Sequence, residues 1–193
     1  MTRGSDYTAH EWELLTTTTE LIGFRMLSVS RSGPIGKLRE LAALSRCLSP
    51  RAIPNQFRRN ELVLALLEDI GAHEAGSVLR LSWNDLSGLA MGLATARRHT
   101  LRYCEDVAVL LADKTPWAEA EGLKRWLVWL ARNIARASGD RWLGLGRRVS
   151  DEEAAMLRQI ATALHLSPIV AISPTPALDT RDVIRDTGAG GDR

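Results

Sequence analysis

Apolar residues recur along most of this chain at spacings of three, four and seven, the period of amphipathic helices. A first helix is expected over about 10–29, because Thr8 and Glu11 form a capping-box pattern at its start and Gly33 follows its end. Its apolar stripe comprises Trp12, Leu15, Ile22, Met26 and Val29. No alternating pattern typical of strands competes anywhere, so the predicted fold is all-α.

Two further helices are predicted before residue 75. The second covers about 35–48 and ends before Pro50 and Pro54, after which a linker runs through Phe57. Its core-facing side is expected to hold Leu38, Leu41, Ala42, Ser45 and Leu48. The third begins after Asn60, a capping residue, and Gly71 is expected to end it. Its buried face is expected to comprise Val63, Leu66, Leu67 and Ile70.

Start signals mark three more helices. A long helix is expected from the cap at Ser82 to about Ala112, with Gly88 and Gly92 on one face. Thr115 and Pro116 begin the next, because proline suits the first helical position. Its stripe is Leu123, Trp126, Leu127, Leu130 and Ile134. The capping box at residues 150–153 begins the last helix, whose buried face is expected to be Leu157, Ile160, Ala161 and Leu164.

The two ends of the chain share one arrangement. Residues 20–48 and 126–166 each comprise a helix, a glycine-containing loop and a second helix. We therefore predict a single bundle of about six helices over residues 1–167, built around two related helix-loop-helix units. The residues from 168 to 193 contain prolines and glycines with few large apolar side chains, and we predict a flexible tail there.

Composition narrows the class of protein. The chain has 193 residues, 45% of them hydrophobic, which is enough for one sizeable core. A balance of 25 basic against 23 acidic residues disfavours a dedicated nucleic-acid binder. Neither a secretory leader nor a transmembrane segment is evident, so a soluble cytoplasmic protein is expected. Cys47 and Cys104 lack metal-site spacing, and reduced buried thiols are expected.

The second unit resembles the tellurite-resistance TerB-like helical family. The matching residues are the alanine-containing helix at 131–138, then Gly139, Val149, Ser150 and Glu153. Gly33, Ile35 and Glu40 resemble the same pattern in the first unit. The resemblance implies an all-α bundle and acidic residues associated with a divalent metal. The family's aspartate before the loop glycine is replaced here by Ser32 and Ser138, and in the second unit Asp140 lies on the far side of Gly139.

A divalent cation of this kind would need several oxygen ligands at one point. The candidate metal ligands are Asp140, Asp151, Glu152, Glu153 and Glu40. A structural interpretation is also open, because Glu153 completes a capping box and the two acids before it suit the positive end of any helix.

A partner-binding site is the other candidate. Six tryptophans against two phenylalanines and two tyrosines is an unusual balance, and tryptophan is enriched at interfaces. The candidate partner-binding residues lie in the second glycine loop and are Trp142, Leu143, Leu145, Arg147 and Arg148. The same loop precedes a helix start, so an anion site is an alternative.

Catalytic motifs are sparse. His73 and Glu74 lack the second histidine of a zincin, and no GxSxG motif occurs. We therefore predict a non-enzymatic accessory or interaction protein that binds another protein or itself. The alternative is a divalent-metal-binding stress-response protein of the tellurite-resistance type.

Overall fold

The computed structural model describes residues 6–30, 33–77, 93–138 and 149–166, and this part of the chain contains helices and no strand. The helices are α1 (Ala9–Val29), α2 (Pro34–Cys47), α3 (Asn55–Arg58), α4 (Glu61–Ser77), α6 (Leu93–Lys114), α7 (Trp117–Ser138) and α8 (Asp151–Ala163). The all-α prediction is confirmed.

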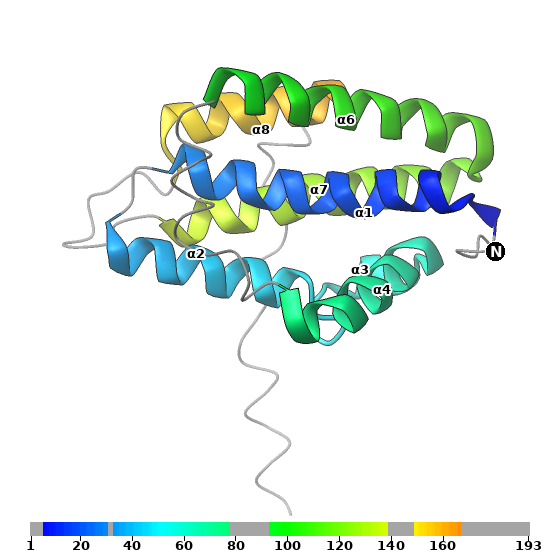
Figure 1. Cartoon of the computed structure of the whole chain (residues 1–193), viewed down its shortest axis with the longest axis horizontal. Coiled ribbons are helices and arrows are strands. Elements are labelled where there is room, and N and C mark those ends of the chain that lie inside the picture. The colour runs from blue at the N-terminus through cyan, green and yellow to red at the C-terminus, as the bar shows by residue number, and fades with distance from the viewer. Residues whose placement is uncertain (1–5, 31–32, 78–92, 139–148, 167–193) are drawn as a thin grey trace, which may run out of the picture.

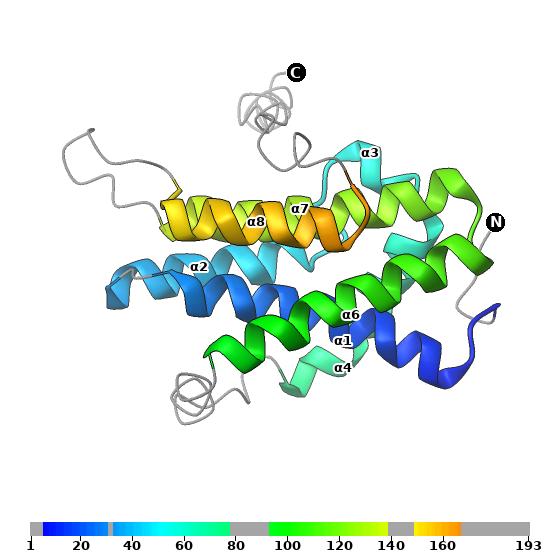
Figure 2. The same cartoon turned by 90° about the horizontal axis from the view of Figure 1, so that it is seen from above.

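The helices form three layers (Figure 1). Helices α6 and α8 form one layer, α1 and α7 the middle layer, and α2 lies with α3 and α4 in the third. Seen from above, α6 crosses α1 while α8 follows α7 (Figure 2). The end of α1, the start of α2, the end of α7 and the start of α8 all lie at one end of the bundle. That the two units are related copies stays a prediction.

Helix α7 is the centre of the fold. It contacts every other described helix, and it is buried on nearly all sides between Leu123 and Ala135. The predicted stripe is confirmed, since its five members are at most 1% exposed. Trp129 on another side packs against Phe57, with ring centroids 5.7 Å apart. Other helices thus cover both this stripe and the side that carries Trp129, which removes the apolar side chains of α7 from water.

Three of the predicted capping residues start their helices, whereas α7 begins at Trp117, one residue later than predicted. Thr8 and Glu11 form the capping box of α1, and Ser150 and Glu153 form that of α8. Asn60 accepts a hydrogen bond from the Val63 N–H at 3.0 Å. Its side-chain amide also donates to the carbonyl of Glu119 at 2.8 Å, so the start of α4 is fastened to α7.

The start of α1 and the residue before its cap contact three residues that are distant in the sequence. Lys114 at the end of α6 lies 2.6 Å from the Glu11 carboxylate, and its hydrogen bond is the main reason why the pKa of Glu11 falls to about 2. Trp12 Nε1 donates to Asp69 of α4 at 3.0 Å. The hydroxyls of Tyr7 and Thr115 are 2.5 Å apart. The start of α1 is therefore held against α4, the end of α6 and the connection between α6 and α7.

Two predictions near α4 are wrong. Gly71 does not end the helix, which continues through alanines to Ser77. The predicted linker contains the short helix α3, because Phe57 turns into the core against Trp129.

The other predicted features fall partly outside the described residues. Outside the described residues lie the start of the long helix at Ser82, the pair Gly88 and Gly92, and the tail at 168–193. Helix α6, which overlaps the second half of that predicted range, ends at Lys114. None of the described helices combines the length and the apolar character that a membrane-spanning segment requires.

Candidate functional site

Helix α2 begins and ends where its sequence predicts. Gly33 is its extended N-cap, and Pro34 occupies the first position, where its missing N–H would have no helical partner. The helix ends at Cys47, and Pro50 follows shortly after. The predicted range of 35–48 is therefore correct to within one residue.

The predicted orientation of α2 is wrong. Of the five residues expected to face the core, only Leu48 is buried, and it lies just beyond the helix. Leu38, Leu41, Ala42 and Ser45 are exposed. The residues that α2 buries instead are Gly36, Glu40, Ala43, Leu44 and Cys47.

Small residues explain this orientation. Helix α2 packs against α7 and α1, and Gly36 and Ala43 present little volume on its buried side. Leu44 fills the space beside α1, where a Cβ on Gly23 would lie 2.9 Å from Leu44 Cδ1. Turning Leu38 toward the core would place a large side chain where a small one fits, and overpacking of this kind is destabilising.

The solvent side of α2 is apolar. Ile35 is 69% exposed, Leu38 63% and Leu41 38%. At about 100° per residue, the exposed residues of this side cover an arc of about 120° that contains no charged side chain. We call this arc the α2 apolar face, and it comprises Pro34, Ile35, Leu38, Leu41, Ala42 and Ser45.

Two exposed arginines follow one margin of the α2 apolar face. Arg39 and Arg46 are seven residues apart, so they lie on the same side of the helix with an axial separation of about 10 Å. Among the described residues, neither takes part in an ion pair, although Arg46 Nε donates to the carbonyl of Ala42 at 3.2 Å. The single acid of α2, Glu40, is buried. The exposed side of α2 is therefore apolar with a positive margin.

Glu40 ties the buried side of α2 to the end of α1. Its Oε1 accepts a hydrogen bond from Ser30 Oγ at 2.5 Å, and Lys37 Nζ lies 3.3 Å from its Oε2. The same ammonium donates to the carbonyls of Leu27 and Ser30, the latter at 2.8 Å. Carbonyls at a helix C-terminus lack helical partners, so this lysine satisfies them. The network keeps Glu40 inside and thereby helps to keep the apolar face outside.

The predicted metal ligands divide between two regions. Asp140 lies outside the described residues. Asp151 and Glu152 are exposed in the first turn of α8, while Glu153 is 2% exposed and accepts from the Ser150 N–H at 2.7 Å. Glu40 lies on α2, where it interacts with Ser30 and Lys37. Within the described ranges, no group of three or more His, Cys, Asp or Glu is placed to hold a metal ion. Metal binding stays a prediction.

The predicted partner-binding residues Trp142, Leu143, Leu145, Arg147 and Arg148 lie outside the described residues. The structure instead reveals the α2 apolar face, which the sequence predicted as core. The sequence contained a signal for this face, because the opposite side of the same helix carries a stripe of small residues, Gly36, Ala43 and Cys47.

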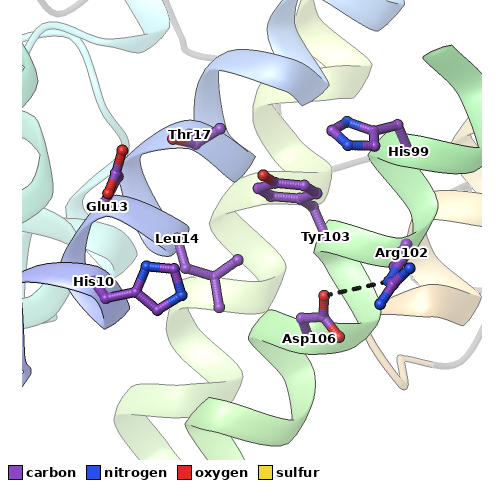
Figure 3. A pocket seen from close by; sticks show the side chains of 8 residues that line it. All are labelled: His10, Glu13, Leu14, Thr17, His99, Arg102, Tyr103 and Asp106. Atoms are coloured by element: carbon purple, nitrogen blue, oxygen red, sulfur yellow. Dashed lines mark ion pairs between the residues drawn. The ribbon is translucent and has the colours of Figure 1, made fainter.

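A groove of about 500 Å³ lies between α1 and α6 (Figure 3). It is lined by His10, Glu13, Leu14 and Thr17 from α1 and by His99, Arg102, Tyr103 and Asp106 from α6. The rings of His99 and Tyr103 are 4.8 Å apart, and Arg102 Nε lies 4.0 Å from Asp106 Oδ2. Both contacts are made within α6, and the ion pair is exposed and therefore weak. The exposed surface of the groove is more apolar than polar, and the contacts among its eight lining residues do not assemble a catalytic group.

The two cysteines are free and buried, as predicted. Burial raises the pKa of both Cys47 and Cys104 to about 12. The thiolate is the reactive form, so neither thiol suits nucleophilic chemistry at neutral pH in the folded protein.

Compared with models of protein families, with curated proteins and with solved structures, the chain matches none. The resemblance to the TerB-like family therefore stays a prediction from the residues quoted above.

Proposed function

We propose that this chain is a non-enzymatic interaction protein on an all-α, TerB-like scaffold, and that it docks another protein through the α2 apolar face. The observation that supports the proposal is the exposure of Ile35, Leu38 and Leu41 as one continuous stripe on a helix whose other side is packed.

Contiguity distinguishes this stripe from ordinary surface apolar residues. Single exposed apolar side chains are common on soluble proteins, whereas contiguous ones mark binding surfaces. Val109 on α6 is 62% exposed, as Leu38 is, but its neighbours one turn away include Glu105, Asp106 and Asp113. Leu38 has Ile35, Leu41 and Ala42 at the corresponding positions.

Docking would release a useful amount of free energy. Covering a half-exposed Leu or Ile side chain contributes about 1 kcal/mol, and more for the most exposed ones. Three such side chains provide about 3–5 kcal/mol before the cost of association. That range suits the centre of a moderate interface, to which a partner would add contacts at the rim.

Site-specific photo-crosslinking in cells tests the proposal. A photoreactive phenylalanine analogue at position 38 is compared with the same analogue at position 109, because Leu38 and Val109 are equally exposed. We expect a discrete protein adduct from position 38 that is lost when Leu41→Asp is added, and none from position 109. Equal labelling from both positions, or a position-38 adduct that Leu41→Asp leaves unchanged, would contradict the proposal.

A further inference from the structure

We infer that the partner presents an amphipathic helix with an apolar stripe for the α2 apolar face and with acidic side chains for Arg39 and Arg46. This inference rests on the proposed function and adds the chemistry of the partner. The charge pattern around α2 is what carries it.

The surroundings of α2 are basic. Residues 33–60 contain one acid, Glu40, which is buried and paired with Lys37. The basic residues of the same stretch are Lys37, Arg39, Arg46, Arg51, Arg58 and Arg59. Arg39 and Arg46 remain without ionic partners in the described part of the chain. An acidic partner would neutralise them and would also be steered toward this side of the molecule.

The shape of the face suits a helix. The large apolar residues Ile35, Leu38 and Leu41 are three residues apart, so they form an inclined row that rises about 9 Å along α2 while it crosses the arc of about 120°. Arg39 and Arg46 flank this row about two turns apart. A partner helix aligned with α2 can cover the row with residues at positions i, i+3 or i+4, and i+7, and can place acids seven residues apart beside the arginines.

A second copy of the chain fits this surface less well. Symmetric pairing through α2 would bring the basic margin of one protomer against a basic margin of the other, because α2 exposes no acid. Like charges across an interface oppose association.

An anionic membrane, like an acidic helix, would complement the charge of Arg39 and Arg46, but it does not suit the shape of this surface. An interfacial helix lies in the headgroup region with its apolar face buried in the bilayer and its polar face in water. The opposite side of α2 is instead packed on α7 and α1, so only the ends of three large side chains could enter lipid.

Peptide binding to the full chain tests the inference. Two labelled 18-residue helices are compared by fluorescence anisotropy, each with the same leucine stripe, one with glutamates beside it and one with lysines at the same positions. The protein variants are wild type, Leu38→Asp and the double reversal Arg39→Glu/Arg46→Glu. The matched control is Arg98→Glu/Arg102→Glu, which reverses two exposed arginines on α6.

We expect saturable binding of the glutamate peptide to wild type. The double reversal on α2 should weaken it by about tenfold and should make the lysine peptide the better ligand, because each partly exposed pair contributes a few-fold and its reversal adds repulsion. The α6 reversal should change the affinity by less than about twofold. Leu38→Asp should remove binding of both peptides.

Several results would overturn the inference. These are equal affinity for the two peptides, insensitivity to the α2 reversal, or binding of neither peptide. Preferential binding to phosphatidylserine vesicles, or mapping of the position-38 adduct to a second copy or to residues 78–92 of the same chain, would identify a different occupant. If a partner adduct still forms at position 38 while the glutamate peptide fails, only the acidic-helix inference falls and the proposed function stands.

Discussion

Helices α2 and α7 lie along each other but bury opposite kinds of side chain. Helix α7 hides its large residues, such as Trp126 and Leu130, and is covered by helices from all three layers. Helix α2 lies at the edge, turns small residues and Glu40 inward, and leaves Leu38 in solvent. A surrounded helix must bury its apolar stripe wherever it points, whereas an edge helix buries the side that fits its neighbours.

The sharpest test of this contrast is the same substitution in both helices. Leu130→Ala on α7 should lower the free energy of unfolding by about 3 kcal/mol, because it opens a cavity at a fully buried site. Leu38→Ala on α2 should change it by less than about 0.5 kcal/mol, since that side chain already lies mostly in water. Urea unfolding followed by circular dichroism measures both. A loss at position 38 as large as that at 130 would show that the α2 apolar face is packed in solution.

Glycines give a second matched pair. A Cβ at Gly122 of α7 would collide with the Asn60 side-chain amide, which caps α4 and donates to the carbonyl of Glu119. Gly122→Ala should therefore lower the free energy of unfolding by about 2 kcal/mol. A Cβ at Gly71 of α4 would meet nothing within 4 Å. Gly71→Ala should therefore stabilise by about 0.5–1 kcal/mol through helix propensity. Thermal unfolding measures both variants, and a Gly122→Ala protein that is as stable as the Gly71→Ala protein would disprove the packing at Asn60.

Glu40→Gln tests whether the buried polar network holds α2 in its orientation. The substitution removes the charge that faces Lys37, and we expect a loss of about 1.5 kcal/mol because Lys37 is partly exposed and can regain water. Glu105→Gln on the exposed side of α6 is the control and should have almost no effect. Chemical denaturation measures both, and equal effects would mean that Glu40 contributes no more than a surface acid.

Thiol reactivity reports whether α2 stays packed against its neighbours. Burial holds the pKa of Cys47 and Cys104 at about 12, so at pH 8 both thiols should react with a disulfide reagent only as the protein unfolds. A raised thiol pKa contributes stability that is fully present below the unfolded-state pKa of about 9. This stability is lost as the pH rises toward the folded-state pKa of about 12. Labelling of Cys47 in a Cys104→Ala variant, faster than unfolding, would show that α2 opens by itself.

Local signals predicted much of the fold. The capping residues Thr8, Asn60 and Ser150 were found because their hydrogen bonds join residues three apart, which a sequence displays directly. The buried stripe of α7 was found because no other side of that helix offers as many large apolar residues.

The candidate site depended on tertiary contacts and was missed. Helical periodicity groups Leu38 with Leu41, but it does not say whether that group faces the core or the solvent. The side of α2 that faces the core is set by α7 and by Gly23 of α1, which leave room for Ala43 and Leu44. The burial of Glu40 likewise depends on Ser30 and Lys37, which a residue-type preference cannot reveal.

The place of α7 along the chain has a consequence for biosynthesis. Helix α1 ends at Val29, but the helix that fills the middle layer beside it is complete only at Ser138. At about 5–20 residues per second, a ribosome needs roughly 5–20 s to make that intervening stretch. During this interval the apolar sides of α1 and α4 have no α7 to cover them. Nascent chains of this protein should therefore depend on molecular chaperones until Ser138, the end of α7, leaves the exit tunnel.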